Sequence, residues 1–290
     1  MLMFRLSLVA MLAVLSGVAT TVAQQPAAAP PTPRQLAQAD LTGYWVAQVT
    51  EDWRWRMMTP PKGDYLGVPL NDAGRKVGDG WDLARDAAGG NLCRSFGAGG
   101  LMRHPLRIRV TWVDDHTLQL ETDLGRQTRL FRFDRSRQST GARSLQGHSV
   151  AQWTRPGPPP APPRQGGAVP EGRAFGPGVA PPPARGRGPA PPPAGGLKVV
   201  TTNLAPGYLR KNGIPYSENA VVTEYYDRVS LFGADYLQLV TVVEDPAYLF
   251  TSFVVSNHFK REPDGAKWNP QPCTVDPPAG TLRREPFVGE

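Results

Sequence analysis

The stretch LRIRVTWVDDHTLQLETDLGRQTRLFRFD, residues 106–134, indicates the fold class of this chain. Apolar and polar residues alternate along its three runs, which is typical of β-strands that bury one face. Asp114 and Asp115 form a turn signal between the first two runs, and Gly125 marks the next turn. The stretch therefore predicts three consecutive antiparallel strands.

Similar alternation continues on both sides of these strands. Further strands are predicted at residues 41–53, 145–154, 197–204, 220–231, 234–245 and 251–262. The first of them is expected to run on into residues 53–58, where Trp53, Trp55 and Met57 alternate with Arg54, Arg56 and Met58. One short helix is predicted within residues 70–81, capped by Asn71 or Asp72. We expect a mostly β fold of about nine or ten strands, arranged as an antiparallel barrel or a sandwich.

A segment rich in proline and glycine, residues 155–196, interrupts this pattern. It offers almost no bulky apolar side chain to offset the entropy of ordering it, so we predict a disordered insertion. The strands after it are too few for an independent sheet with protected edges. We therefore predict a single β-rich domain over residues 40–276, followed by a tail at 277–290.

The N-terminal residues 1–23 have the order of a secretory signal peptide. Arg5 precedes an apolar run that ends near Val18, and small residues at Thr21 and Ala23 precede the expected cleavage. The apolar run is shorter than the roughly 20 residues that span a bilayer. We predict export to the periplasm or the extracellular space, with a flexible leader at residues 24–39 and no transmembrane segment after cleavage.

Cys93 and Cys273 are the two cysteines of the chain. Two thiols in an oxidising compartment most often form a disulfide, so we expect these two to be joined. A metal site and a reactive thiol are the alternatives. Neither cysteine belongs to a CxxC pair or adjoins a histidine, as zinc-binding motifs require, and we predict no metal and no cofactor.

The formal net charge of +7 is concentrated outside the predicted strands. Five arginines and one glutamate within residues 155–196 contribute +4, and Arg5 contributes +1. The remainder, +2, is an ordinary surface charge. A nucleic-acid partner is therefore not expected, because such a partner requires a basic stripe on the folded part.

Several sequence blocks resemble known families. Gly43 to Trp45 (GYW) is similar to the Gly-x-Trp that opens lipocalin-type barrels. The blocks TEDWRWRMMTPPKGDY (50–65), GYLRKNGIPYSENAVVTEYYDR (207–228) and VVEDPAYL (242–249) resemble a family of uncharacterised exported bacterial proteins. This resemblance implies a secreted protein with a lipocalin-like β-barrel, and it implies no catalytic residues.

Two groups of aromatic and cationic residues are the candidate ligand-binding site. Flat rings supply apolar contact area, while arginine binds an anionic group through two hydrogen bonds. We expect these groups to converge at a barrel mouth: Trp53, Arg54, Trp55, Arg56, Lys62 and Tyr65 in the first, and Tyr208, Arg210, Tyr216, Glu224 and Tyr225 in the second. The alternative is a structural network in which Glu224 pairs with Arg54 or Arg56.

Three functions are compatible with these patterns. The first is a non-catalytic barrel that binds a small amphipathic or anionic molecule. The second is a periplasmic enzyme that uses Glu224 or Glu51 with a tyrosine or histidine as acid and base, although the four histidines form no local motif. The third is an envelope protein whose basic proline-rich loop contacts an anionic surface.

Overall fold

The structure is a computed structural model that describes residues 29–134, 141–154 and 196–278. The predicted signal peptide at 1–23, most of the predicted insertion at 155–196 and most of the predicted tail at 277–290 lie outside these ranges. Residues 29–31 belong to a separate unit and have no regular secondary structure, whereas every helix and strand lies in the unit that starts at Thr32.

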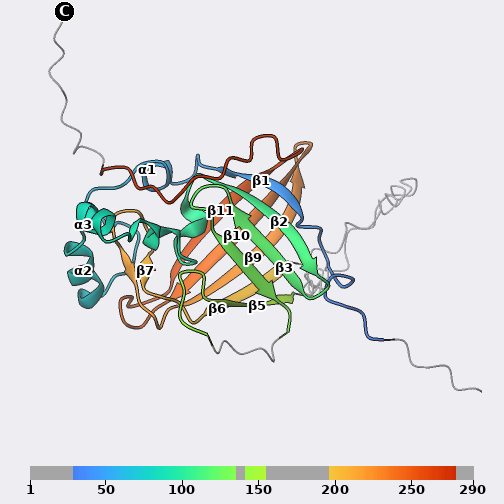
Figure 1. The fold of residues 1–290 in the computed structure, drawn as a ribbon, viewed down its shortest axis with the longest axis horizontal. Helices are drawn as coiled ribbons and strands as arrows, with labels where there is room; N and C mark the ends of the chain where they lie inside the picture. Colours follow the sequence, from blue (N-terminus) through green and yellow to red (C-terminus); the bar gives the residue numbers. More distant parts are fainter. Residues whose placement is uncertain (1–28, 135–140, 155–195, 279–290) are drawn as a thin grey trace, which may run out of the picture. The chain divides into compact units, whose positions relative to one another are not determined.

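Nine strands close into a barrel in the order β1-β11-β10-β9-β6-β5-β4-β3-β2 (Figure 1). The barrel strands are β1 (Gly43–Gln48), β2 (Arg107–Asp114), β3 (Thr117–Thr122), β4 (Thr128–Arg132), β5 (His148–Trp153), β6 (Leu197–Thr202), β9 (Val221–Leu231), β10 (Ala234–Glu244) and β11 (Phe253–Glu262). Neighbouring strands are antiparallel except β4 and β5, which pair in parallel over two residue pairs. The predicted mostly β fold is confirmed, and of its two forms the chain adopts the barrel.

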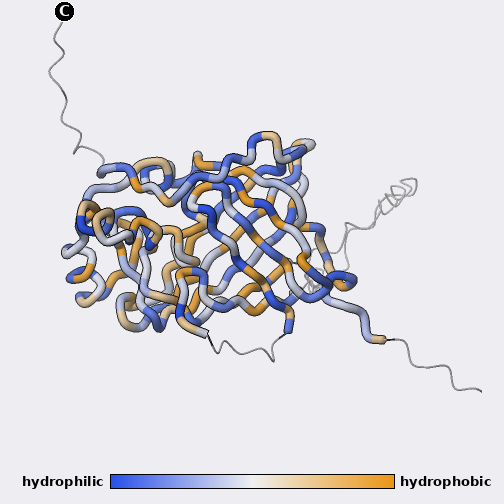
Figure 2. Tube along the Cα trace, in the orientation of Figure 1, coloured by the Kyte–Doolittle hydropathy of each residue, from blue (hydrophilic) through white to orange (hydrophobic). Residues whose placement is uncertain are grey.

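Alternation along the strands directs one set of side chains into the barrel. Ile108 and Val110 on β2, and Leu118 and Leu120 on β3, are buried, while the residues between them are partly exposed. Figure 2 shows hydrophobic and hydrophilic positions alternating along the barrel strands. Buried side chains fill the interior, from Trp45 on β1 to Phe259 on β11.

Residues 53–58 are not a strand, which corrects the predicted extension of β1. Asp52 adopts a left-handed conformation (φ 52°), and the chain then forms the short helix α1 (Trp53–Arg56). The alternation of tryptophan and arginine resembles a strand, but this turn of helix exposes Trp53 and buries Arg56. The other helical elements are α2 (Asp72–Asp79), α3 (Leu83–Ala88) and the 3₁₀ helices η1 (Leu92–Phe96) and η2 (Leu101–Arg103), so α1 and α3 add to the one predicted helix.

Helix α2 is the predicted helix, and Asn71 caps it by accepting a hydrogen bond from the Gly74 amide at 2.9 Å. It packs through glycines. A Cβ at Gly74 would lie 2.5 Å from the Tyr248 carbonyl oxygen, and one at Gly78 would lie 2.8 Å from the Tyr65 hydroxyl. The glycines that weaken this helix intrinsically therefore permit its close contact with the rest of the fold.

The helices and the small hairpin of β7 (Gly207–Tyr208) and β8 (Pro215–Tyr216) lie at one end of the barrel (Figure 1). A second group of buried apolar residues, including Leu209, Ile214 and Tyr216, packs there. We call this end the capped end. No helix formed by the described residues has the length and apolarity needed to cross a membrane.

The residues on either side of the segment 155–195 lie close together. β5 and β6 pair antiparallel, with Trp153 opposite Leu197. The amide and the hydroxyl of Thr154 each donate to the Gly196 carbonyl oxygen at 2.8 Å. The strands before and after this segment thus belong to one barrel, and the segment connects two neighbouring strands of it.

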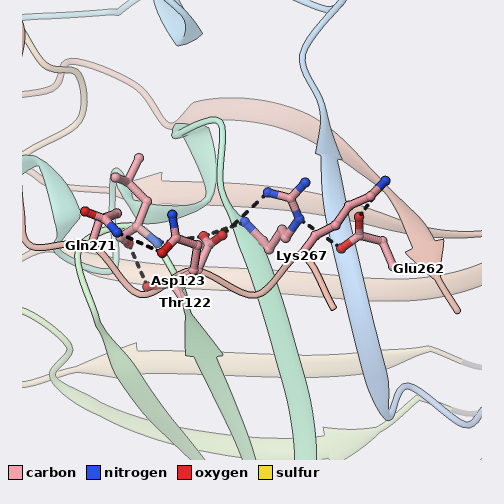
Figure 3. A network of polar contacts seen from close by, with 8 residues as sticks. Thr122, Asp123, Glu262, Lys267 and Gln271 are labelled. Carbon is pink, nitrogen blue, oxygen red and sulfur yellow. Dashed lines mark hydrogen bonds and ion pairs between the residues drawn. The ribbon is translucent and has the colours of Figure 1, made fainter. Parts of the chain in front are cut away.

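The chain after β11 forms a strap, residues 263–276, along the outside of the barrel. Figure 3 shows Lys267 beside Glu262, and Gln271 beside Asp123 near the β3–β4 turn. The Gln271 amide donates to the Asp123 carbonyl oxygen at 2.8 Å. Beyond it, Cys273 forms a disulfide with Cys93 on η1, so the predicted disulfide is present.

Candidate functional site

Charged residues are buried in two separate places, and the first is the barrel interior. Arg129 on β4 donates to both carboxylate oxygens of Glu224 on β9, at 2.8 and 2.5 Å, and both side chains are inaccessible to solvent. Tyr226 donates to Glu224 at 3.0 Å, and Thr201 accepts from Arg129 at 3.0 Å. Burial alone lowers the pKa of Arg129, but the negative charge of Glu224 reverses this effect and raises it. This pair is a matched ion pair.

The second place is the capped end, where four cationic side chains are buried together. We call them the mouth cluster: Arg56, Arg103, Arg210 and Lys211. Helix α1 supplies the first and η2 the second, while Arg210 and Lys211 come from the loop between β7 and β8. Trp55 lies beside them, with the Arg210 guanidinium carbon 4.7 Å from the centre of its ring.

Main-chain carbonyl groups provide most of the hydrogen-bond partners of the mouth cluster. Arg56 donates to the carbonyl oxygens of Gln48 at 2.5 Å and Arg103 at 3.3 Å. Arg210 donates to Leu66 at 2.8 Å, and Lys211 donates to Met57 at 3.1 Å. These bonds fix the positions of the cations without neutralising their charge.

Carboxylates balance this charge only in part. Asp52, which is partly exposed, forms an ion pair with Arg103 at 3.1 Å. Among the described residues, Arg56, Arg210 and Lys211 have no carboxylate within ion-pair distance. Burial, followed by repulsion from Arg103, lowers the pKa of both Arg56 and Arg210 to about 10. Both remain charged at neutral pH, so positive charge is buried with incomplete neutralisation.

A small space lies within the mouth cluster. Its volume is about 10 Å³, and its lining is Trp55, Gly100, Arg103, His104, Leu209, Arg210 and Lys211. Several N–H groups of these residues have no hydrogen-bond partner within the described part of the chain: Trp55 Nε1, Arg103 Nε and Nη1, and Arg210 Nε. Every one of them is a donor, so the residues that line the space carry unsatisfied donors and positive charge.

His104 lines the same space and is neutral. Its ring stacks on Phe96 with centroids 3.9 Å apart, and its Nε2 lies 2.9 Å from the Ser95 carbonyl oxygen. A carbonyl oxygen only accepts, so Nε2 carries the proton and donates. Burial, and then the charges of Lys211 and Arg56, lower the pKa of His104 to about 3. The histidine therefore adds no further positive charge to the cluster.

The structure brings part of the two predicted groups together. Trp55, Arg56 and Arg210 meet at the mouth cluster, and the exposed Arg54 lies beside them, paired with Asp64 at 2.8 Å. The others lie elsewhere: Trp53 and Lys62 are exposed, Tyr65 donates to Asp79, Tyr208 donates to Asp86, Tyr216 is in the core of the capped end, and Tyr225 lies on the outer face of β9.

The predicted pairing of Glu224 with Arg54 or Arg56 is wrong, because Glu224 points into the barrel and binds Arg129. Sequence reasoning also missed Arg103 at the mouth. The inward position of Arg129 could have been predicted from the sequence. Arg129 lies two residues before Phe131 on one strand, so both side chains are on the inward face. The sequence gives no signal for the burial of Arg103, because that burial results from contacts between distant segments.

The predicted acid–base residue Glu51 lies against a histidine. The His258 Nδ1 and the Glu51 Oε1 are 2.5 Å apart, and each side chain is about one third exposed, at 36% and 31%. Neither residue lines the space within the mouth cluster.

Comparisons with protein-family models, with curated proteins and with solved structures found no match for this chain. The sequence Gly43 to Trp45 predicted a lipocalin-like barrel, and the structure agrees in being a closed barrel. Trp45 is fully buried in it. This barrel has nine strands and one parallel pair, whereas lipocalin barrels have eight antiparallel strands. Membership of a family of exported proteins stays a prediction.

Proposed function

We propose that this protein is a non-catalytic binding barrel, and that the mouth cluster binds the anionic group of a small molecule. The observation that carries this proposal is the chemistry of the residues that line the small space. Trp55, Arg103 and Arg210 carry unpartnered N–H donors there, together with incompletely neutralised positive charge. Burying unpaired donors and charges is costly, and an anion at this position removes both costs.

An anion fits this space better than water does. A volume of about 10 Å³ accommodates roughly one water-sized atom. A water molecule must also donate its two hydrogens, and the unsatisfied atoms around the space are donors themselves. One oxygen of a carboxylate, sulfate or phosphate group accepts from several donors at once and carries the complementary charge. The ligand therefore inserts one oxygen, and the rest of it lies outside the space.

The alternative for these residues is structural. The bonds from Arg56, Arg210 and Lys211 to carbonyl oxygens hold separate loops together, and this role needs no ligand. A structural role leaves stability independent of added anions. The binding role makes stability rise with anion concentration, because an anion that binds only the folded state stabilises it by mass action.

The test is a titration of the folded protein with sodium acetate, sulfate and phosphate at constant ionic strength, followed by calorimetry and by melting temperature. We expect saturable binding and a rising melting temperature. Arg210→Gln removes one charge at the site and should weaken binding at least tenfold, given that hydrogen bonds to charged groups contribute roughly 1.5–3 kcal/mol. Arg85→Gln removes the same charge from an exposed position on α3 and should leave binding unchanged. The absence of saturable binding of all three anions would refute the proposal.

Export, the acid–base enzyme and the envelope interaction stay predictions. The basic proline-rich segment lies outside the described residues. For the enzyme, the contact between Glu51 and His258 is the feature to test, and Glu51→Gln should abolish any hydrolytic activity found in the purified protein.

A further inference from the structure

An open groove lies next to the mouth cluster on the outside of the barrel. Its volume is about 810 Å³. Two segments form its walls, residues 63–69 before α2 and residues 250–254 at the start of β11, and Arg75 completes it. The size falls in the range of pockets that hold small organic ligands, roughly 300–1,000 Å³.

The groove exposes large apolar side chains to solvent. Phe250 is 72% exposed, Leu66 is 63% exposed and Val254 is 57% exposed. The backbone behind Phe250 is fixed, because its amide donates to the Pro69 carbonyl oxygen at 3.0 Å and Leu249 forms a bridge with Leu70. The apolar groups are thus displayed by an ordered frame. Grouped apolar exposure of this kind marks binding sites.

Two charged residues line the groove, Asp64 and Arg75, and of these Asp64 has an ionic partner. Asp64 forms an ion pair with Arg54 at 2.8 Å, and the Arg75 guanidinium lies over the Tyr65 ring at 5.8 Å. Arg75 keeps its charge, but the large exposed side chains of the groove, Phe250, Leu66 and Val254, match an apolar chain.

Arg210 separates the groove from the space within the mouth cluster. Its guanidinium donates to the carbonyl oxygen of Leu66, a groove residue, and lies 6.0 Å from the ring of Phe253, another groove residue. Gly67 adopts a left-handed conformation (φ 77°) and has no side chain, and a Cβ there would lie 3.6 Å from Arg210 Nη2. A group in the groove at Gly67 is therefore within reach of the Arg210 guanidinium.

We propose that the ligand is an amphipathic anion with one apolar chain, whose anionic head binds at Arg210 in the mouth cluster and whose chain lies in the groove between Leu66 and Phe250. This inference rests on the proposed function and adds the class of ligand. It also places the chain outside the barrel, whose interior is filled by its own side chains.

The experiment measures affinity for linear alkyl carboxylates of increasing length, from acetate to decanoate, by calorimetry below their micelle concentrations. Burying a methylene contributes about 0.8 kcal/mol, and a chain in an open groove is covered on about one side. We expect affinity to rise about two- to fourfold per methylene until the groove is filled. Phe250→Ser and Leu66→Ser should flatten this rise, because each removes an apolar side chain that the ligand chain would contact.

Phe232→Ser is the matched control. Phe232 is fully exposed in the turn between β9 and β10, away from the groove, so its replacement should leave the whole series unchanged. If Phe232→Ser flattens the series as strongly as Phe250→Ser does, the chains bind non-specifically and the inference is wrong.

The outcomes separate the two proposals. If acetate, sulfate or phosphate binds at Arg210 but chain length has no effect, the groove inference fails and the anion site stands. If decanoate binds equally well to Arg210→Gln, the groove binds apolar molecules without a head group, and the inference is also wrong. If neither short nor long anions bind, the proposed function itself fails.

Discussion

Buried arginines have different partners in the barrel interior and in the mouth cluster. In the interior, Arg129 has its own carboxylate, Glu224, and supporting hydroxyl groups. At the mouth, Arg56 and Arg210 are held by carbonyl oxygens and keep most of their charge unpaired. The charges of a buried ion pair balance each other, whereas the charge of a buried unpaired cation is left without a counter-charge. The difference supports the proposal that the mouth cluster binds an anion, whereas the interior pair needs none for charge balance.

The largest expected effect comes from breaking the interior pair. Glu224→Gln leaves Arg129 buried without a counter-charge, and we expect the free energy of unfolding to fall by about 3–5 kcal/mol. Urea unfolding measures this change. Adding Arg129→Met to Glu224→Gln removes the isolated charge and should recover at least half of the loss. A loss below about 1 kcal/mol for Glu224→Gln would show that the pair does not contribute as an ion pair.

The second effect is a pH dependence that arises at the mouth. His104 titrates near its ordinary pKa of 6.5 when the chain is unfolded and at about 3 when it is folded. The unfolded state therefore binds the extra proton as pH falls from 6.5 toward 3, and stability falls by up to about 1.4 kcal/mol per pH unit in this window.

His104→Gln should remove this contribution, so that its stability falls less steeply than that of the unmodified protein between pH 6.5 and pH 4. Urea unfolding at several pH values measures the slopes. His116→Gln, at an exposed turn position, is the control and should keep the original slope. Equal slopes for all three proteins would show that His104 takes up a proton in the folded state.

The smallest expected effect is the stability change at the mouth itself. Arg210→Gln loses a contact with Trp55 and the hydrogen bond to the Leu66 carbonyl oxygen, but it also relieves the repulsion from Arg103. In the absence of added anions, we expect the free energy of unfolding to change by no more than about 1 kcal/mol. A loss as large as that of Glu224→Gln would contradict the contrast between the two regions and favour the structural role.

The strands were predictable because their information is local. Alternation along residues 106–134 predicts β2, β3 and β4, and the turn signals at Asp114, Asp115 and Gly125 separate them. The same local rule failed at α1, where alternating tryptophan and arginine resembled a strand. The left-handed Asp52 turns the chain there, and neighbouring residues do not signal it.

The candidate site was predictable in part. The grouping of Trp55, Arg56 and Arg210 agrees with the structure because arginine and aromatic rings are concentrated in two short blocks. The partner of Glu224 was not predictable. β4 and β9 are not neighbours in the sheet, so Arg129 and Glu224 meet across the barrel interior, and no pairing pattern along the chain relates them. Closure of the barrel, a property of the whole chain, determines that contact.

The disulfide between Cys93 and Cys273 has a mechanical consequence. If the chain is pulled by residues before Thr32 and after Asp276, the force passes directly from Cys273 to Cys93. The chain between the two cysteines, which contains every barrel strand except β1, carries no tension along this path. Among the barrel strands, β1 alone is loaded by such a pull, and helices α1 to α3 are loaded with it because they also precede Cys93. The disulfide therefore confines the load to the part of the chain before Cys93 and shields the strands β2 to β11.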